Sequence, residues 1–515
     1  MKHALARKGT DSRFSGPRSP SPLRGSLARK MVSVPFLAVL SCAAADVPRS
    51  VCDVTAYGAK GDGKTLETAA IQKAINACAK AGGGTVYFPA GNFLSGTIVL
   101  QSNVTLNLSP GATLWGSKDI AHYNPPHLIY AKDAENIAIE GSGTINGNGD
   151  AFWEPDFKPK PKRPSPLIEL VGCRHVRIEN VRIRNTPGWG IHPLECDGVW
   201  IRGISMISDL RGPNTDGIDP DSSRNVMISD CYIETGDDAI VLKTTGRLRI
   251  PAPPCENVTV TNCVLISDDA ALKLGTESHG DFRNCTFSNC SIYATRVGLA
   301  MYIKDGALVE GILFSNIAID TSVDLYNRVT GSQRTWIEYP ILIDLEKRQT
   351  DSRTGRIRDV SFSNLRVRGE GRVLVAGMPE QPLENFTFRN LALRVTGFEP
   401  VEKQRKPRGS SRVSPAPREG DYAPVPAALI FANIKGLDLR DMRVTWDAPG
   451  PPQDRHAIYA GRVEGFTLHG FAGAAAGGKL AAIGLEKAKD VFISGAADAL
   501  TRGATYVHLP EGQPR

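Results

Sequence analysis

A short phrase that recurs along the chain restricts its fold more than any other feature. Each copy begins with an apolar anchor, alternates apolar and polar residues, and ends on Asn, Asp or Gly four places later. Successive anchors are 23 to 32 residues apart except for one interval of 48, where we expect one coil whose anchor has drifted. The copies are VRIEN (176–180), VWIRG (199–203), VMISD (226–230), VTVTN (258–262), CTFSN (285–289), ILFSN (312–316), VSFSN (360–364) and FTFRN (386–390), with weaker copies at 137–141, 437–441, 466–470 and 491–495.

The alternation with period two makes each phrase a short β-strand that buries one face. The terminal Asn, Asp or Gly supplies a turn residue that tolerates a left-handed backbone. A single repeat of this length cannot bury its apolar face, but stacked parallel coils can. We therefore expect an all-β chain folded as a right-handed parallel β-helix, with residues 46–515 forming one domain. The 51 Gly and 35 Pro suit such a turn-rich fold.

One helix is expected near the start of this domain. Residues 65–84 place apolar side chains at helical spacing, with a Thr as the N-terminal cap and glycines at the C-terminal stop. This helix would cover the N-terminal end of the solenoid, where an open sheet edge invites aggregation. Two stretches rich in Pro and charge, 154–166 and 399–420, are expected to be surface loops.

Residues 1–45 have the features of a leader. Arg29 and Lys30 precede an apolar run (31–43) that ends in small residues, an order typical of a secretory signal with Met31 as the true start. The run is too short to span a bilayer. We expect an exported protein, periplasmic or extracellular, with no membrane span. A lipoprotein anchor at Cys42 is the alternative.

The positive charge of the chain belongs to this leader. The formal charge is +7 for the whole chain, and residues 1–45 alone hold eight Lys or Arg and one Asp, which also gives +7. The remainder is therefore close to neutral. This removes the electrostatic argument for binding nucleic acid.

The cysteines suggest packing more than a disulfide framework. Cys231, Cys263 and Cys290 each follow a phrase anchor by five residues, as a stacked internal column would. Cys52 and Cys78 are possible disulfide partners. No CxxC pair or His/Cys cluster suggests a metal, and we expect neither a metal nor another cofactor.

Three aspartates stand in an otherwise apolar, turn-rich stretch: Asp216 in NTDGID (214–219), and Asp237 and Asp238 in TGDD (235–238). Asp216 and Asp237 are 21 residues apart, about one coil, so we expect them on neighbouring coils of one face. Repulsion and partial burial would raise one pKa and place a protonated acid beside ionised bases, which suits hydrolysis of a sugar linkage. Simple turn chemistry is the alternative. We expect no Lys or Arg to neutralise the three carboxylates, which favours catalysis.

In these motifs the chain resembles the polygalacturonase family of inverting glycoside hydrolases, which act on pectin and share the parallel β-helix. The resemblance spans roughly residues 52–395. It implies that Asp237 is the general acid, and that Asp216 and Asp238 hold and activate water, with carboxyl groups about 6.5–9.5 Å apart. It also implies a pectic polysaccharide as substrate, and we expect the protein to act as a monomer. The matching segments are 54–75, GTINGNGDAFW (143–153), NTPGWGIHP (185–193), NTDGIDPDS (214–222) and TGDDAIVLK (235–243).

Two positions depart from the family pattern. Aligned on GTE (275–277), Asp269 stands where the family carries the histidine of a GHG motif, and Tyr302-Ile303-Lys304 keeps only the lysine of the family's RIK. The missing Arg normally pairs with carboxylates of the substrate, and a Tyr does not replace a bidentate Arg. We therefore expect a pectic substrate other than plain polygalacturonate, such as rhamnogalacturonan.

Further residues are candidates for substrate binding. Trp189 and His192 could stack on a sugar and hydrogen-bond its hydroxyls, or could pack in the core. Lys243 and Lys273 fall at similar places after their pairs of aspartates, and for Lys243 we favour a structural ion pair. The complete set expected to bind substrate is Asn214, Lys304, Tyr302, His192, Trp189, Asp269 and Glu277.

Two other function classes stay open at this point. A pectate-lyase-type eliminase would share the β-helix but would need calcium-binding acids and an Arg base. A non-catalytic carbohydrate-binding β-helix would have no need of three clustered carboxylates.

Overall fold

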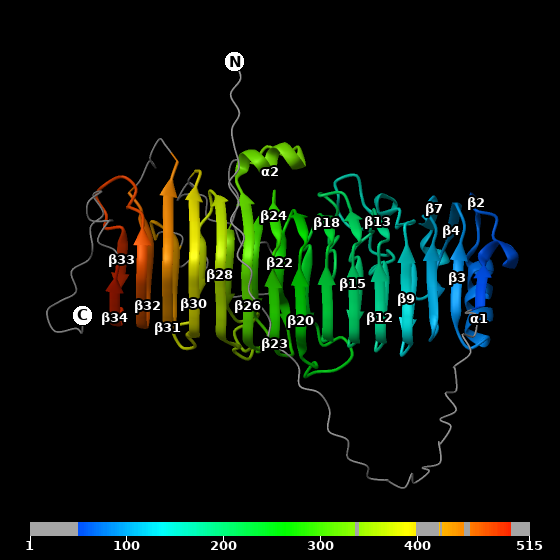
Figure 1. The fold of residues 1–515 in the computed structure, drawn as a ribbon, viewed down its shortest axis with the longest axis horizontal. Coiled ribbons are helices and arrows are strands. Elements are labelled where there is room, and N and C mark those ends of the chain that lie inside the picture. Colours follow the sequence, from blue (N-terminus) through cyan, green and yellow to red (C-terminus); the bar gives the residue numbers. More distant parts are fainter. Residues whose placement is uncertain (1–49, 335–338, 398–421, 423–424, 448–453, 496–515) are drawn as a thin grey trace, which may run out of the picture. The chain divides into compact units, whose positions relative to one another are not determined.

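The computed structural model describes residues 50–334, 339–397, 422, 425–447 and 454–495. Within these ranges the paired strands named below are all parallel, and successive coils stand side by side in chain order (Figure 1). The chain thus folds as the expected right-handed parallel β-helix. The leader (1–45) and the loop at 399–420 lie outside the described residues, so both expectations stay predictions.

Each coil contributes strands to up to three columns. The first column holds β1 (Ser50–Asp53), β3 (Gly84–Phe88), β6 (Val104–Leu108), β9 (Glu135–Gly141), β12 (Arg174–Glu179), β15 (Asp197–Arg202), β17 (Arg224–Ser229), β20 (Cys255–Thr261), β23 (Phe282–Ser288), β26 (Leu308–Thr321), β28 (Arg356–Gly369), β30 (Leu383–Val395), β31 (Ala427–Trp446), β32 (His456–Ala472) and β34 (Lys489–Ser494). The repeated phrases are the strands of this column.

The second and third columns follow the first along each coil. The second holds β2 (Asp62–Leu66), β4 (Gly91–Ser95), β7 (Ala112–Gly116), β10 (Thr144–Asn146), β13 (Arg182–Arg184), β16 (Ser205–Ile207), β18 (Tyr232–Thr235), β21 (Val264–Ser267) and β24 (Ser291–Tyr293). The third holds β5 (Ile98–Val99), β8 (Ile129–Lys132), β11 (Ile168–Val171), β14 (Ile191–Leu194), β19 (Ile240–Thr244), β22 (Ala270–Ser278), β25 (Val297–Ile303), β27 (Tyr339–Leu345), β29 (Val373–Ala376) and β33 (Ile483–Glu486).

The core repeats from coil to coil because the phrase repeats. The third residue of four successive phrases is Phe, and the rings of Phe287, Phe314, Phe362 and Phe388 stack with centroids 4.8, 5.0 and 4.4 Å apart. Their planes are within 11° of parallel. Burial of such aromatic side chains supplies much of the apolar area that a solenoid needs.

The ends of the phrases form a ladder of turns. All eight phrases end on a residue with φ between 54° and 64°, as the sequence predicts. Side-chain amides link the coils here: Asn316 donates to Asn289 (3.1 Å), Asn364 to Asn316 (2.9 Å) and Asn390 to Asn364 (2.8 Å). These ladders fix the register between coils.

The interval of 48 residues does not contain the additional coil with a drifted anchor that we expected. β26 pairs directly with β28, with Ile312 opposite Val360, so the interval is one long coil. Its extra length includes a short helix, α2 (Val323–Thr330), inserted between the second and third columns. A strand repeat predicts the spacing of ordinary coils, but it carries no signal for an insertion.

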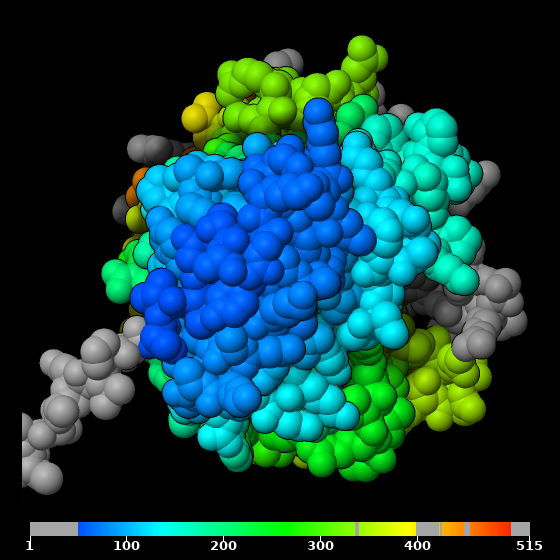
Figure 2. All heavy atoms as spheres, turned by 90° about the vertical axis from the view of Figure 1, so that its right-hand side faces the viewer, coloured from blue at the N-terminus to red at the C-terminus, as the bar shows by residue number. Residues whose placement is uncertain are grey.

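The expected N-terminal helix is present as α1 (Thr68–Lys80). Its apolar face, with Ile71 and Ile75, is buried, and Figure 2 shows the early part of the described chain covering this end. The expected Thr cap is wrong: Glu67 holds the N-cap position, and its carboxylate instead accepts hydrogen bonds from the N–H groups of Lys60 (2.6 Å) and Gly61 (2.8 Å). Three short 3-10 turns are η1 (Val54–Tyr57), η2 (Ile120–His122) and η3 (Gly149–Phe152).

The nine cysteines within the described residues pack as single thiols. Cys231, Cys263 and Cys290 are buried in successive coils and form the expected column. Cys52 and Cys78 are free thiols, so the possible disulfide between them is not formed. No helix in the described ranges is long and apolar enough to cross a membrane.

Candidate active site

The three aspartates lie on two adjacent coils at the start of the third column. Asp216 precedes Ile218, which bridges β14 and β19, and Asp237 and Asp238 precede β19 itself. The backbone N–H of Gly217 donates to the carbonyl of Asp238 (2.8 Å), so the coils touch here. One carboxylate oxygen from each aspartate lies within 4.8 Å of the others. The expected crowding of carboxylates is therefore present.

Glycine allows this close approach. A Cβ atom on Gly236 would lie 2.4 Å from the carbonyl oxygen of Gly212, and one on Gly217 would lie 2.3 Å from that of Ala239. The carbonyl of Asp237 then accepts hydrogen bonds from the hydroxyls of Thr235 (2.8 Å) and Ser267 (2.7 Å). The NTDG and TGDD motifs thus hold the carboxylates rigidly, because their glycines and hydroxyls fix the turns.

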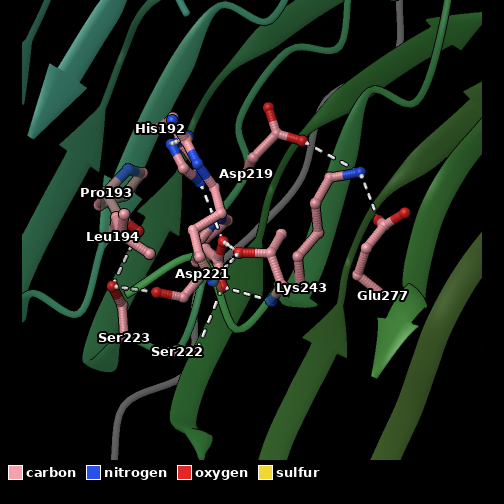
Figure 3. Close-up of polar contacts among 12 residues, drawn as sticks. His192, Pro193, Leu194, Asp219, Asp221, Ser222, Ser223, Lys243 and Glu277 are labelled. Carbon is pink, nitrogen blue, oxygen red and sulfur yellow. Dashed lines mark hydrogen bonds and ion pairs between the residues drawn. The ribbon is translucent and has the colours of Figure 1, made fainter. Parts of the chain in front are cut away.

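Two lysines neutralise part of the cluster, contrary to our expectation that no Lys or Arg would do so. The Nζ atom of Lys243 lies 3.3 Å from Asp216 Oδ2, and that of Lys273 lies 2.7 Å from Asp238 Oδ2. Lys243 also lies 3.7 Å from an oxygen of Asp219 and 3.7 Å from one of Glu277 (Figure 3). The ion pair favoured for Lys243 is confirmed. The pairing of Lys273 with Asp238 was not expected, because Lys273 stands on a neighbouring strand of the third column.

Burial raises the pKa of all three aspartates. Asp216 and Asp238 are almost fully buried, and Asp237 is half-buried. For Asp237, burial raises the pKa well above its usual value, and the charges of Asp216 and Asp238 raise it further. Burial also raises the pKa values of Asp216 and Asp238, against the nearby ammonium groups. Because the three carboxylates lie close together, the negative charge of one favours the protonated form of its neighbours.

The geometry would also admit a cation among the three oxygens. However, Lys243 and Lys273 already balance the charge of Asp216 and Asp238. Asp237 has no ion pair within the described residues, so a proton is most favourable there. The arrangement places Asp237 beside two carboxylates that each face an ammonium group.

Asp219 is a further acid beside the three aspartates. Its place at the end of NTDGID (214–219) did not distinguish it from an ordinary turn residue. Its side chain is fully buried, and neither of its oxygens accepts a hydrogen bond from the described residues. Burial raises its pKa to about 8, although Lys243 acts in the opposite direction. Its position next to Lys243 (Figure 3) links it to Asp216 through one shared ammonium group.

His192 is not placed to hydrogen-bond a sugar. Its side chain is fully buried, with Nδ1 2.6 Å from Glu169 and Nε2 3.2 Å from Asp221 (Figure 3). These two carboxylates occupy both ring nitrogens and raise the pKa of the imidazole, although burial alone would lower it. The structure thus agrees with the core alternative for His192. Trp189 is half-buried, packs edge-on against His192 at 5.1 Å, and has the Nζ atom of Lys243 4.6 Å from its ring centroid.

The two departures from the family pattern lie beside the cluster. The charge of Asp269 contributes to the raised pKa values of Asp237 and Asp238. The ring of Tyr302 has the Nζ atom of Lys273 5.4 Å from its centroid. The positions of the family's His and Arg are thus filled by a carboxylate and a phenol next to the reaction centre.

The remaining expected ligands are placed less directly. Lys304 forms an ion pair with Glu346 (2.7 Å), and Glu277 is half-buried beside Lys243. Asn214 is exposed, and its amide Nδ2 donates to Asp237 Oδ2 (3.4 Å). Arg163 reaches Asn214 from the loop at 154–166, which we expected to be only a surface excursion. The sequence held no signal for this contact.

A cavity of about 690 Å³ is lined by residues close in sequence to the cluster, among them Glu234 and Asp268, but not by the three aspartates themselves. One side is formed by residues 209–211, next to Gly212, whose carbonyl group packs on Gly236. Another side is formed by α2. Tyr326 of α2 donates its hydroxyl proton to Asp268, and Arg334 pairs with the same carboxylate (3.1 Å). The lining residues are Asn185, Ile207, Ser208, Asp209, Leu210, Arg211, Glu234, Asp268, Tyr326, Thr330, Gly331, Ser332 and Arg334.

Two curated proteins have sequences similar to that of this chain. The chain is 35% identical over 283 residues to a probable polygalacturonase of Vitis vinifera, a match covering 48% of this chain and 58% of that protein. It is 30% identical over 342 residues to an exo-poly-alpha-D-galacturonosidase of Dickeya chrysanthemi, covering 53% and 55%. This chain therefore spans a little over half the length of these two curated relatives.

Solved structures give the same fold. An exopolygalacturonase from Thermotoga maritima matches with a TM-score of 0.57 and 25% identity, covering 68% of this chain and 88% of that chain. A family 28 exopolygalacturonase of Yersinia enterocolitica matches with a TM-score of 0.59 at 21% identity, covering 86% and 78%, which shows a shared fold. The family model described as glycosyl hydrolases family 28 matches residues 78–406, well over half of the chain. This chain therefore belongs to glycosyl hydrolases family 28.

Proposed function

We propose that this protein is a glycoside hydrolase that cleaves glycosidic bonds of pectic polysaccharide by a single displacement. Asp237 is the general acid, and Asp216 and Asp238 hold and activate the attacking water. The observation that carries this proposal is the unequal environment of three clustered carboxylates. Two of them face ammonium groups, and the third, half-buried, has none within ion-pair distance among the described residues.

Each carboxylate has a distinct task in this scheme. Asp237 gives its proton to the oxygen of the leaving sugar, because its raised pKa keeps that proton near neutral pH. Lys243 and Lys273 favour the ionised forms of Asp216 and Asp238, so these two can accept hydrogen bonds from water and take up its proton. The names of the relatives, which include polygalacturonases, support a pectic substrate.

Inversion rests on the family resemblance. Carboxyl groups of inverting enzymes are typically about 6.5–9.5 Å apart and those of retaining enzymes about 5 Å apart. One oxygen of each carboxylate here lies within 4.8 Å of the others. Proton NMR of the first-formed sugar decides the point: we expect the opposite anomer to that of the substrate, and retention would replace the single displacement by a covalent intermediate.

We propose a pectic substrate other than plain polygalacturonate. Asp269 and Tyr302 replace two groups that grip uronates in the family, and Lys304 is already paired with Glu346. The nearest cations of the cluster, Lys243 and Lys273, are paired as well. A sugar without a carboxylate, such as rhamnose, therefore suits at least one of the two positions flanking the scissile bond.

Digestion of a panel of defined pectic oligomers in heavy-oxygen water, followed by mass spectrometry, tests the reaction and the substrate together. We expect one heavy oxygen in each product pair and faster cleavage of rhamnogalacturonan than of polygalacturonate. Faster cleavage of polygalacturonate would contradict the substrate proposal. Products that absorb in the ultraviolet, without heavy oxygen, would indicate an eliminase instead.

We also propose that the protein acts as an exported monomer. The order of basic, apolar and small residues at 29–45 supports export. Sequencing of the mature N-terminus from the secreted fraction tests this proposal, and a lipid-modified Cys42 would identify a lipoprotein. Light scattering of the mature protein tests the oligomeric state, and a dimer mass would contradict the monomer.

A further inference from the structure

Arg163, in the loop at 154–166, places its guanidinium group at the edge of the reaction centre. Nη1 of Arg163 donates to the carbonyl oxygens of Pro187 (3.0 Å) and Pro213 (2.7 Å), and Nη2 donates to Oδ1 of Asn214 (3.0 Å). Pro187 and Pro213 lie on turns of successive coils, so the half-buried Arg163 ties both turns to the loop. Ser165 of the same loop accepts a hydrogen bond from the N–H of Trp189 (3.0 Å).

The guanidinium fixes the orientation of the Asn214 amide. Arg carries only donors, whereas an Asn amide has one accepting oxygen and one donating nitrogen. Asn214 must therefore turn its oxygen towards Arg163, and its nitrogen then faces Asp237. The reverse orientation would set two donors against each other and an amide oxygen against the carboxyl oxygen.

This orientation matters for the acid proton. Oδ1 of Asp237 accepts the backbone N–H of Asp238 (2.9 Å), so the proton of a neutral Asp237 belongs on Oδ2, the oxygen that Asn214 contacts. An N–H group pointing at Oδ2 leaves that proton free to turn towards a leaving group. An amide oxygen pointing there would accept the proton and hold it away from the substrate.

We propose that Arg163 is a positioning residue that holds the Asn214 amide so that the proton of Asp237 stays available to the substrate. This inference rests on the proposed function, in which Asp237 is the general acid. We call these three residues the Arg163–Asn214–Asp237 relay. Arg163 acts through Asn214 and has no direct contact with the reacting atoms.

The relay also sets the acidity of Asp237. The charged groups that face Asp237 are Asp216, Asp238 and Asp269, which raise its pKa, and Lys273, which lowers it. Arg163 is a further positive charge near Asp216 and Asp237. Both the charge of Arg163 and the donation from Asn214 favour the ionised acid, so removing either one is expected to raise the pKa of Asp237.

The test is the pH profile of kcat/KM for Arg163→Gln, measured on the pectic oligomer that the wild type cleaves. We expect the alkaline limb, where the acid loses its proton, to move to higher pH by about one unit, and kcat to fall about tenfold. Arg184→Gln is the matched control, because Arg184 also donates to two backbone carbonyls, of Ile183 (2.7 Å) and Ser205 (2.6 Å). Its profile should match that of the wild type. An unmoved limb in Arg163→Gln overturns the inference.

A double-mutant cycle separates the relay from a direct effect of charge. Asn214→Ala removes the amide and should also move the limb upwards. If Arg163 acts through Asn214, adding Arg163→Gln to Asn214→Ala should change kcat no further. Independent, additive losses would overturn the relay. If Arg163→Gln does not fold, Arg163→Lys replaces it, because a Lys keeps the charge but loses the pair of nitrogens that reach both carbonyl groups and Asn214. A fall in kcat supports the relay, and a wild-type kcat contradicts it.

Asp237→Asn distinguishes a failure of the relay from a failure of the proposed function. If it is inactive while Arg163→Gln keeps the wild-type profile, the relay is wrong and the proposed function stands. If Asp237→Asn cleaves normally, Asp237 is not the acid and both proposals fall.

Discussion

Asp219 and Asp221 stand two residues apart on one short stretch, and both are completely buried, yet their environments are opposite. Asp221 accepts hydrogen bonds from Thr245 and Ser222 and contacts His192, and these contacts hold its pKa below the usual value although burial alone would raise it. Asp219 accepts none from the described residues, and burial raises its pKa to about 8. Burial alone therefore does not decide the charge of a carboxylate; its donors do.

The same contrast separates two neighbouring clusters on the third column. Around His192, the carboxylates of Glu169 and Asp221 share a fully bonded network, and the pKa values of both acids are lowered despite their burial. Around Asp237, carboxylates outnumber cations and the pKa values are raised. The first cluster is a set of charged hydrogen bonds that links neighbouring coils. In the second cluster, repulsion between neighbouring carboxylates raises their pKa values, as acid–base catalysis requires.

The sharpest test of this contrast is Asp237→Asn. Because Asp237 supplies the proton in the proposed reaction, we expect cleavage to fall by about 10²–10⁴-fold. The thermal stability should not fall, because Asn is neutral and has nearly the shape of the protonated Asp237 side chain. Release of reducing ends and calorimetry measure the two effects. Asp230→Asn, at the exposed end of a phrase, is the control and should retain full activity; loss of stability without loss of activity in Asp237→Asn would reverse the assignment of the two clusters.

The second test removes the centre of the bonded cluster. His192→Ala leaves Glu169 and Asp221 buried without their shared partner, so we expect the free energy of unfolding to fall by about 3–5 kcal/mol. Thermal unfolding at pH 6 checks this expectation. His279→Ala is the control, because His279 is partly exposed and lies 3.9 Å from Asp305. Equal stabilities of the two variants would show that the His192 cluster is not structural.

The two clusters should respond to pH with opposite signs. Asp219, whose pKa rises from 3.8 to about 8 on folding, stabilises the protein while it is protonated, and this contribution is lost as the pH rises from about 4 towards 8. Asp219→Asn should therefore flatten the decline of the free energy of unfolding over this range, by a few kcal/mol. Asp221, with a lowered pKa, loses its contribution only as the pH falls. A steeper alkaline decline in Asp219→Asn would contradict the raised pKa.

The smallest expected effect concerns one donor of Asp221. Thr245→Val removes a hydroxyl that donates to this carboxylate, so the pKa of Asp221 should move towards that of Asp219. We expect the free energy of unfolding at pH 7 to fall by about 1 kcal/mol, and less at pH 4, where Asp221 is closer to being protonated. Urea unfolding at both values measures the difference. Thr259→Val, on a half-exposed position of β20, should show no such dependence on pH; a loss that is equal at both pH values would contradict the role of Thr245.

Much of the fold was predictable because its causes are local. Alternation of apolar and polar residues predicts the strands of the first column, and the terminal residue of each phrase predicts a left-handed turn. The stacked Phe rings and the Cys column follow from the same repeat. Two predictions failed where the cause was not local: α2 is inserted in one long coil, and the carboxylate of Glu67 turns back to Lys60 and Gly61.

The acids of the site could be predicted from the sequence, but most of the groups that contact them could not. The spacing of NTDG and TGDD by about one coil placed Asp216 beside Asp237 and Asp238. Lys243 and Lys273 recur at similar places after their acidic pairs, and this recurrence was the available signal for their role. Arg163 gave no signal, because its contact with Asn214 depends on how a long loop returns to the coil.

The sequence by itself determined the solenoid, its register and the meeting of three aspartates, because a repeat with period two permits few other ways to bury its apolar face. The tertiary structure alone decided which carboxylates gained donors. Asp221 gained hydrogen bonds from Thr245 on the next coil, and Asp219 gained none from the described residues. A distant loop supplied the guanidinium group that orients the amide facing Asp237. The physical reason is that the pKa of a buried acid depends on groups a few ångströms away in space, and these groups lie on other coils.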